Sequence, residues 1–173
     1  MSKIIAMLLK EMEQEAQTTR KMLAIVPDDK HDWKPHAKNM TMRELALHIP
    51  DMLGWVELVL NSDELDFAKS PYQLPDITDN KGILEFFEDR YNAARQALEN
   101  ATEEDFEPNW TLREGDAIYH VASKGEWIRS CYCQVVHHRA QLGMYLRLLN
   151  IPIPGSYGPS ADEMEAMMAA HQA

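Results

Sequence analysis

The stretch His137-His138-Arg139-Ala140-Gln141-Leu142 lies within a largely apolar segment that ends near Asn150. Apolar residues recur through this segment at spacings of three and four, which predicts a helix with one side facing a core. The predicted inward residues are Ile128, Cys131, Val135, His138, Leu142, Tyr145 and Leu149. The capping box Ser123-Lys124-Gly125-Glu126 marks the start of this helix, and Pro152 and Pro154 follow its end.

Three more long helices are predicted upstream. The first runs from about residue 2 to 24, the second starts at the capping box Thr41-Met42-Arg43-Glu44, and the third runs from about 81 to 100. Pro50 lies inside the second helix, where we expect a kink just after His48. A further capping box, Ser160-Ala161-Asp162-Glu163, starts a short terminal helix. Long connections at 61–80 and 101–122 predict crossovers, so we expect one all-α domain over 1–173, a four-helix bundle.

Composition restricts the function. Asp and Glu number 28 against 17 Lys and Arg, and the net charge is −11. A surface with this much negative charge repels phosphate backbones and anionic membranes. We therefore expect neither nucleic acid nor a membrane as a partner. The N-terminus is too polar for a signal peptide, and no apolar run is long enough to span a membrane. With only two cysteines, spaced two apart on a helix, we expect no disulfide and a cytoplasmic location.

Two histidines and a glutamine form the candidate site. Gln134 and His138 are four residues apart, so both emerge from one face of the last long helix. His48 is predicted to face inward on the second helix. If these helices are neighbours, the three side chains converge and can bind a divalent metal with coordination positions left open. The alternative is that both histidines are core residues that hydrogen-bond to neighbours without a metal.

The ordered motifs resemble the DinB-like family across nearly the whole chain. They are His48, the segment from Trp110 to Gly115, His137 to Leu142, Tyr145-Leu146-Arg147 and Tyr157 to Glu163. The resemblance implies a four-helix bundle with an unusual crossover topology, often a homodimer. It also implies a three-histidine site for zinc, nickel or manganese. His48 and His138 match that site, whereas Gln134 stands where the family has a histidine, so the resemblance implies weak or absent metal binding here.

The resemblance also implies a choice of functions. Its relatives include metal-dependent transferases that use low-molecular-weight thiols such as bacillithiol and mycothiol. We therefore expect a thiol S-transferase or a hydrolase, with a small thiol or an electrophile as substrate. The sequence identifies no general base, and it contains no Gly-rich phosphate loop and no Gly-x-Ser-x-Gly motif. The alternative is a non-catalytic dimeric bundle with a degenerate site, which binds small molecules or is linked to stress.

Several other residues carry expectations. Arg139 is expected to pair with a carboxylate for structural reasons, or alternatively to orient an acidic substrate. Trp55 and Tyr145 are expected to pack in the core or at an interface, or alternatively to line a pocket beside the metal. Cys131 and Cys133 are expected to be small buried apolar groups.

Predicted loops and the terminal helix hold the remaining candidates. His31, His36, His120 and His171 are expected to be solvated. Met164, Met167 and Met168 form a stripe on the terminal helix, which we interpret as a packing or dimer face, or alternatively as a flexible apolar surface for a ligand.

Overall fold

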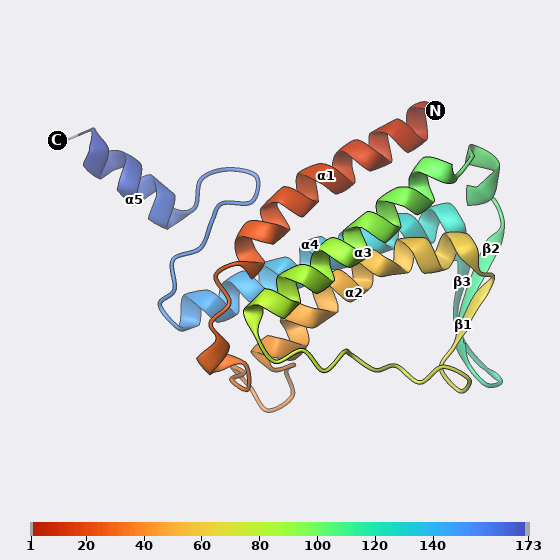
Figure 1. Cartoon of the computed structure of the whole chain (residues 1–173), viewed down its shortest axis with the longest axis horizontal. Coiled ribbons are helices and arrows are strands. Elements are labelled where there is room, and N and C mark those ends of the chain that lie inside the picture. Colours follow the sequence, from red (N-terminus) through yellow and green to blue (C-terminus); the bar gives the residue numbers. More distant parts are fainter. Residues whose placement is uncertain (1, 172–173) are drawn as a thin grey trace.

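Four long helices form a bundle in the computed structural model, which describes residues 2–171 (Figure 1). They are α1 (Lys3–Leu23), α2 (Met42–Asn61), α3 (Asn80–Asn100) and α4 (Lys124–Leu148). The predicted all-α four-helix bundle is therefore confirmed, with helix bounds that differ from the expected ones by one or two residues. Two short 3₁₀ helices, η1 (Asp28–Lys30) and η2 (Glu103–Phe106), lie in the connections.

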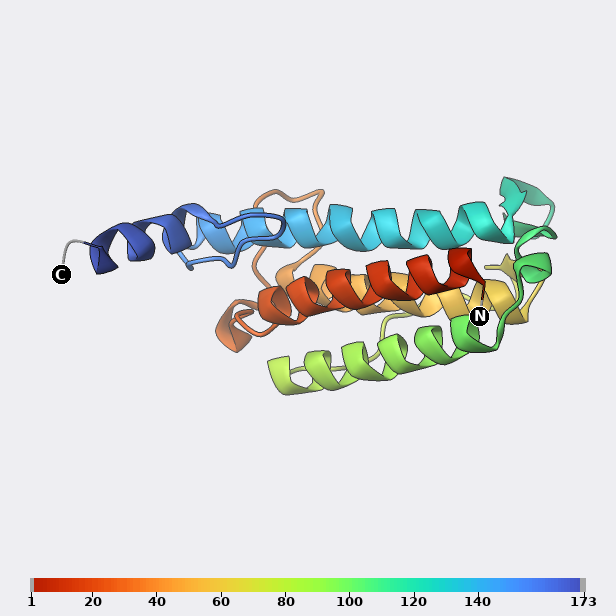
Figure 2. The same cartoon turned by 90° about the horizontal axis from the view of Figure 1, so that it is seen from above.

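One long crossover determines how the helices are arranged. After α2 the chain returns along the outside of the bundle, so that α3 runs in the same direction as α2, while α1 and α4 run the opposite way (Figures 1 and 2). Helix α2 packs on both α3 and α4, and α1 packs on the other side of the same two helices. This arrangement places α2 beside α4, which is the condition for the histidines to meet.

Side-chain caps start the helices where the sequence predicts. The Thr41, Ser123 and Ser160 hydroxyls each accept a hydrogen bond from the backbone N–H three residues on, and the glutamate at that position binds back in all three capping boxes. Ser2 caps α1 in the simpler one-way form, 3.1 Å from the Ile5 nitrogen. These local bonds explain why helix starts can be read from sequence alone.

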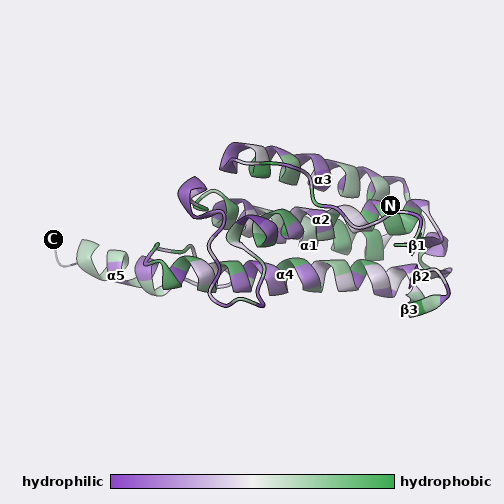
Figure 3. Ribbon diagram, turned by 90° about the horizontal axis from the view of Figure 1, so that it is seen from below, coloured by the Kyte–Doolittle hydropathy of each residue, from purple (hydrophilic) through white to green (hydrophobic). Residues whose placement is uncertain are grey.

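The core lies between the four helices. Its fully buried members include Ile5, Met12, Leu23, Leu45, Ile49, Ile83, Phe87, Leu98, Ile128 and Leu142. Hydrophilic residues cover the outward side of α3, as the colours of Figure 3 show. Within residues 2–171, no helix combines the length and apolarity needed to cross a membrane.

A small sheet closes one end of the bundle. Strands β1 (Glu64–Asp66), β2 (Asn109–Glu114) and β3 (Ala117–Ser123) pair in that order, β1 parallel to β2 and β2 antiparallel to β3. The Asp66 carboxylate joins β1 to the β2–β3 hairpin, because it accepts hydrogen bonds from the Ala68 and Gly115 nitrogens at 3.0 and 2.9 Å. The sequence analysis treated both segments as plain connections and so missed this sheet.

Arg139 joins α4 to α1 inside the core. Only 1% of Arg139 is exposed, and one of its Nη atoms lies 2.6 Å from the Glu15 carboxylate. The guanidinium also donates to the Glu15 carbonyl and the Thr19 hydroxyl, both at 3.1 Å. The expected structural ion pair is therefore present, and Arg139 rather than His138 is the α4 residue that enters the core at this level.

Two expectations about burial, those for His31 and Cys133, were wrong, and the dimer or ligand face expected on the terminal helix stays a prediction. His31 is 7% exposed instead of solvated, because η1 turns it inward with its Nε2 3.6 Å from an Asp28 carboxylate oxygen. Cys133 is exposed, since only Cys131 lies on the inner side of α4. The helix α5 (Ala161–Ala170) buries none of its residues, and Met164, Met167 and Met168 are all exposed. Figure 2 shows α5 projecting beyond the end of the bundle.

Candidate metal centre

The two predicted histidines meet where α2 packs against α4. The ring centroids of His48 and His138 are 4.5 Å apart, and the ring planes are inclined at 73°. Both side chains are half-buried rather than fully buried, so they lie at the edge of the core and remain accessible. His137 is exposed beside His138, with 4.9 Å between the ring centroids.

Gln141 determines which nitrogen of His138 carries the proton. His138 Nδ1 lies 3.0 Å from Gln141 Oε1, three residues further along α4. An amide oxygen only accepts hydrogen bonds, so His138 must donate from Nδ1. Its Nε2 therefore keeps the lone pair that a metal or a proton can take.

Tyr72 positions His48 in the same way. His48 Nδ1 lies 2.8 Å from the Tyr72 hydroxyl. Burial and the charge of the neighbouring Asp51 carboxylate raise the pKa of Tyr72, and burial raises the pKa of Asp51. In the tautomer in which His48 donates from Nδ1, the Tyr72 oxygen accepts, as the Gln141 oxygen does for His138. His48 thus also presents an unprotonated Nε2.

Burial favours the neutral form of both imidazoles. It lowers the pKa of His48 to about 4, and His138 contributes a smaller lowering through its charge. Burial also lowers the pKa of His138. Neutral imidazole is the form that binds metals, so both side chains are ready ligands at neutral pH.

Gln134 lines the same pocket as His48, one turn before His138 on α4. The structure therefore brings the three predicted residues to one place. Within residues 2–171 there is no group of three or more His, Cys, Asp or Glu side chains able to hold a metal. Any third protein ligand at this pair of imidazoles must therefore come from another residue type, and the amide oxygen of Gln134 is the neighbouring candidate.

The histidine pair fits a shared divalent ion. With metal–nitrogen bonds of about 2.0–2.1 Å, two imidazoles on one tetrahedral ion have centroids roughly 5 Å apart. The observed separation is 4.5 Å, close to that value. Two neutral nitrogens and an amide oxygen satisfy a divalent ion less well than three histidines, so the donor set fits a weakly held ion with open positions.

Two other predicted site residues have different outcomes. Trp55 lines the pocket beside His48, which was the alternative to core packing. Tyr145 does not, since it packs edge-on against Trp33 at 5.6 Å and donates to the Met40 carbonyl at 3.2 Å. Cys131 contributes to the pocket wall as an apolar thiol, because burial raises its pKa to about 12.

The sequence analysis missed Tyr72 and Asp51. Asp51 is three residues after His48 on α2, so its place on the same helix face was readable in principle. Tyr72 lies in the crossover between β1 and α3, and no periodic pattern fixes where such a segment passes.

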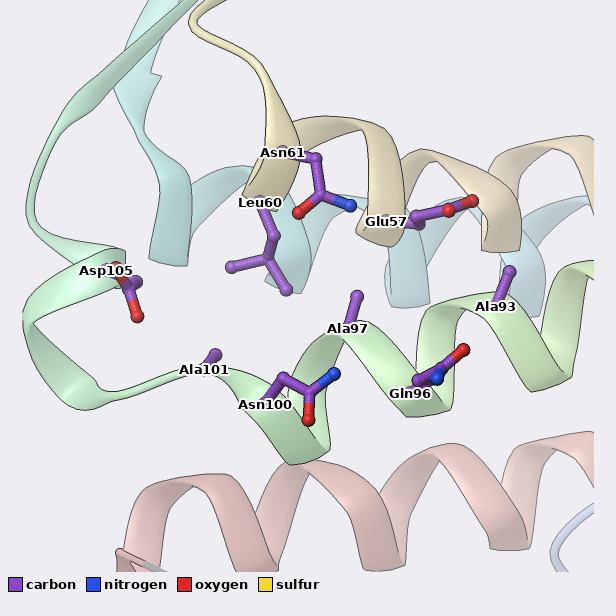
Figure 4. A pocket seen from close by; sticks show the side chains of 9 residues that line it. All are labelled: Glu57, Leu60, Asn61, Ala93, Gln96, Ala97, Asn100, Ala101 and Asp105. Carbon is purple, nitrogen blue, oxygen red and sulfur yellow. The ribbon is translucent and has the colours of Figure 1, made fainter.

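A second groove lies between α2 and α3, away from the histidines. It has a volume of about 240 Å³ and contains no histidine. Figure 4 shows Glu57 and Asn61 of α2 on one side and Gln96 and Asn100 of α3 on the other, with Ala97 between them. This groove has carboxylates but no imidazole to bind a metal beside them, so the candidate metal site is the pocket beside His48.

The fold and this site together define a class: a four-helix bundle with one crossover and a pair of neutral imidazoles between its second and fourth helices. The model of the DinB family matches residues 1–172. The chain belongs to the DinB family.

Known relatives are similar over most of their length. The uncharacterized protein YrdA of Bacillus subtilis is 26% identical over 156 residues, which cover 90% of this chain and 89% of YrdA. Among solved structures, the DinB-like protein YjoA of B. subtilis has a TM-score of 0.67 at 16% identity, covering 87% of this chain and 96% of YjoA. YfiT of B. subtilis has a TM-score of 0.61 at 15% identity, covering 88% and 91%. YfiT is described as a probable metal-dependent hydrolase with an unusual four-helix bundle topology.

Proposed function

We propose that this protein is a divalent-metal-dependent hydrolase of the DinB type, with His48, His138 and Gln134 as its metal ligands. The observation that carries the proposal is the contact between two neutral imidazoles. Each Nδ1 atom is hydrogen-bonded to a neighbouring side chain, so each Nε2 lone pair is left to bind a metal. Membership of the DinB family and the description of YfiT support a metal-dependent reaction.

Each residue of the site has its own role in this proposal. His48 and His138 would supply the nitrogen ligands, Tyr72 orients the first, and Gln141 orients the second. The ligand set carries no negative charge, so the full charge of a bound ion acts on the substrate. A divalent ion supplies Lewis acidity there, which polarises an acyl carbonyl and lets water ionise near neutral pH.

Hydrolysis is assigned ahead of thiol transfer because it needs only one organic reactant beside the imidazoles. Transfer to or from a thiol needs room for two organic reactants, the thiol and the electrophile, at the same time. The pocket that His48 lines has a volume of about 420 Å³, which is the size of a single small ligand. Thiol S-transfer remains the second chemistry for the same ion and is assayed in parallel.

The test is the metal content of protein purified without a histidine tag. We expect zinc, nickel or manganese in the native protein or after its addition, and loss of that metal in the double variant His48→Ala/His138→Ala. Circular dichroism of both proteins checks that the bundle is intact. Native protein that holds no metal and takes up none would contradict the proposal and would favour the non-catalytic bundle.

A matched variant tests the third ligand. Gln134→Ala is expected to weaken metal binding, whereas Arg129→Ala, one turn or so before it on the same helix and also exposed, is expected to leave it unchanged. Equal affinities in both variants would exclude Gln134 as a ligand without excluding the histidine pair.

A further inference from the structure

The pocket beside His48 is walled by apolar and aromatic side chains. Helix α2 contributes Met52 and Trp55, the end of β1 leads to Phe67, β2 contributes Leu112, and α4 contributes Trp127. Its volume is about 420 Å³. An apolar cavity of about 150 Å³ already takes up benzene, so this one has room for a substituted ring or a fused pair of rings.

None of the described residues that line the pocket is Lys, Arg, Asp or Glu. A charged group placed there would lose its hydration and meet no side chain of opposite charge. The protein carries a net charge of −11, yet this pocket is uncharged. The occupant is therefore an uncharged group.

The aromatic wall is held in a fixed position. Trp127 Nε1 donates to the Trp110 carbonyl at 3.0 Å, and Trp110 Nε1 donates to the Ser62 hydroxyl at 2.9 Å. Trp110 is fully buried behind Trp127, with 4.8 Å between their ring centroids, and Trp55 lies 6.5 Å from Trp127. Rings that are already ordered lose little conformational freedom when a flat ligand packs on them.

The pocket runs along α2 away from the imidazoles. Met52 and Trp55 follow His48 by four and seven residues, which places them about 6 and 10 Å further along the helix axis. On α4, Ser130 and Gln134 also line the pocket, at intervals of four residues before His138. An occupant can therefore place an apolar ring among the tryptophans and a polar group beside the histidines.

We propose that this pocket binds an uncharged aromatic group of the substrate, so that the reacting bond lies within about one or two helical turns of that ring. The inference rests on the proposed function, because it gives the substrate class for that same site. Neutral aryl or arylalkyl esters and amides have the required form.

The experiment compares three ligands of the same shape that differ in charge. Binding of 4-fluorobenzyl alcohol, 4-fluorobenzoate and 4-fluorobenzylammonium to the full chain is measured by ¹⁹F NMR line broadening, first without metal. We expect the neutral alcohol to bind at least about tenfold more tightly than either ion, because neither ion finds a partner in the pocket. Equal or tighter binding of an ion would overturn the inference.

Variants locate the binding. Trp55→Ala is expected to weaken binding of the alcohol at least about fivefold, and Leu112→Trp, which fills the pocket, to abolish it. Phe86→Ala on α3 is the matched control, since Phe86 is a half-buried aromatic residue outside this pocket. Circular dichroism confirms that each variant is folded. Unchanged binding in a folded Leu112→Trp protein would overturn the inference.

Zinc uptake measured on the same samples separates the two proposals. Preference for the neutral ring without any metal binding would refute the proposed function and retain the pocket. Metal binding without that preference would retain the proposed function and refute the substrate class.

Discussion

The hydroxyl of Tyr72 offers the sharpest test of how the site is built. Tyr72→Phe removes the oxygen that lies 2.8 Å from His48 Nδ1 and leaves the ring in place. Without it, Nδ1 has lost its acceptor, and the proton can move to Nε2, the nitrogen that a metal needs. The expected result is weaker metal binding with little change in the fold.

The size of the effect follows from the position of Tyr72. Removal of a group that orients a metal-binding histidine typically costs 10- to 100-fold in affinity, or about 1.4–2.7 kcal/mol. Tyr72 is 44% exposed, so water can partly replace the lost hydroxyl. We therefore expect the lower part of this range, about 10- to 30-fold.

The assay is competition for zinc between the protein and a chromophoric chelator at neutral pH. Tyr119→Phe is the matched control, because Tyr119 is also an exposed tyrosine whose hydroxyl contacts a carboxylate, that of Glu114. If Tyr72→Phe and Tyr119→Phe both bind zinc within threefold of the native protein, the Tyr72 hydroxyl does not orient His48.

Three further predictions follow. Gln134→His should tighten zinc binding by about tenfold or more in the same competition assay, because imidazole is a stronger ligand than an amide oxygen. Glu15→Ala should lower the free energy of unfolding in urea by about 3–5 kcal/mol, because it leaves the buried Arg139 guanidinium without its carboxylate. The contact of Asp162 with Arg147 lowers the pKa of Asp162 from 3.8 to about 2, so its stabilising contribution is complete above pH 3.8 and is lost as the pH falls toward 2. Urea midpoints of the native protein and Asp162→Asn should therefore differ at pH 5 and converge near pH 2.

Controls and contrary outcomes are available for each. No gain in affinity in Gln134→His would mean that this position does not reach the ion. Glu99→Ala, which breaks the exposed Arg95–Glu99 pair, should cost less than about 1 kcal/mol, and a similar cost for Glu15→Ala would show that Arg139 is not dependent on Glu15. A constant difference between native protein and Asp162→Asn from pH 5 to 2 would mean that Asp162 titrates normally.

The histidine site shows how far sequence reasoning reaches. His48, Gln134 and His138 could be selected because helical periodicity places Gln134 and His138 on one face of α4 and predicted an inward position for His48. The sequence could not predict how deeply each of these side chains is buried, because residues on one helix face differ in burial. Arg139 takes the core position next to His138 since Glu15 and Thr19 of α1 offer it partners, and those lie 124 and 120 residues away in the chain.

The sequence by itself determined the helix starts, the all-α class and the three candidate ligands. Caps and the helical period act between residues three or four apart, so they need no knowledge of the rest of the chain. Only the tertiary structure decided the sheet, the burial of His31 and the partner of His48. Strand β1 pairs with β2 from more than forty residues away, and Tyr72 reaches His48 only because the crossover passes that side of the bundle. Such contacts depend on how segments far apart in the chain pack together, and local sequence patterns do not specify that packing.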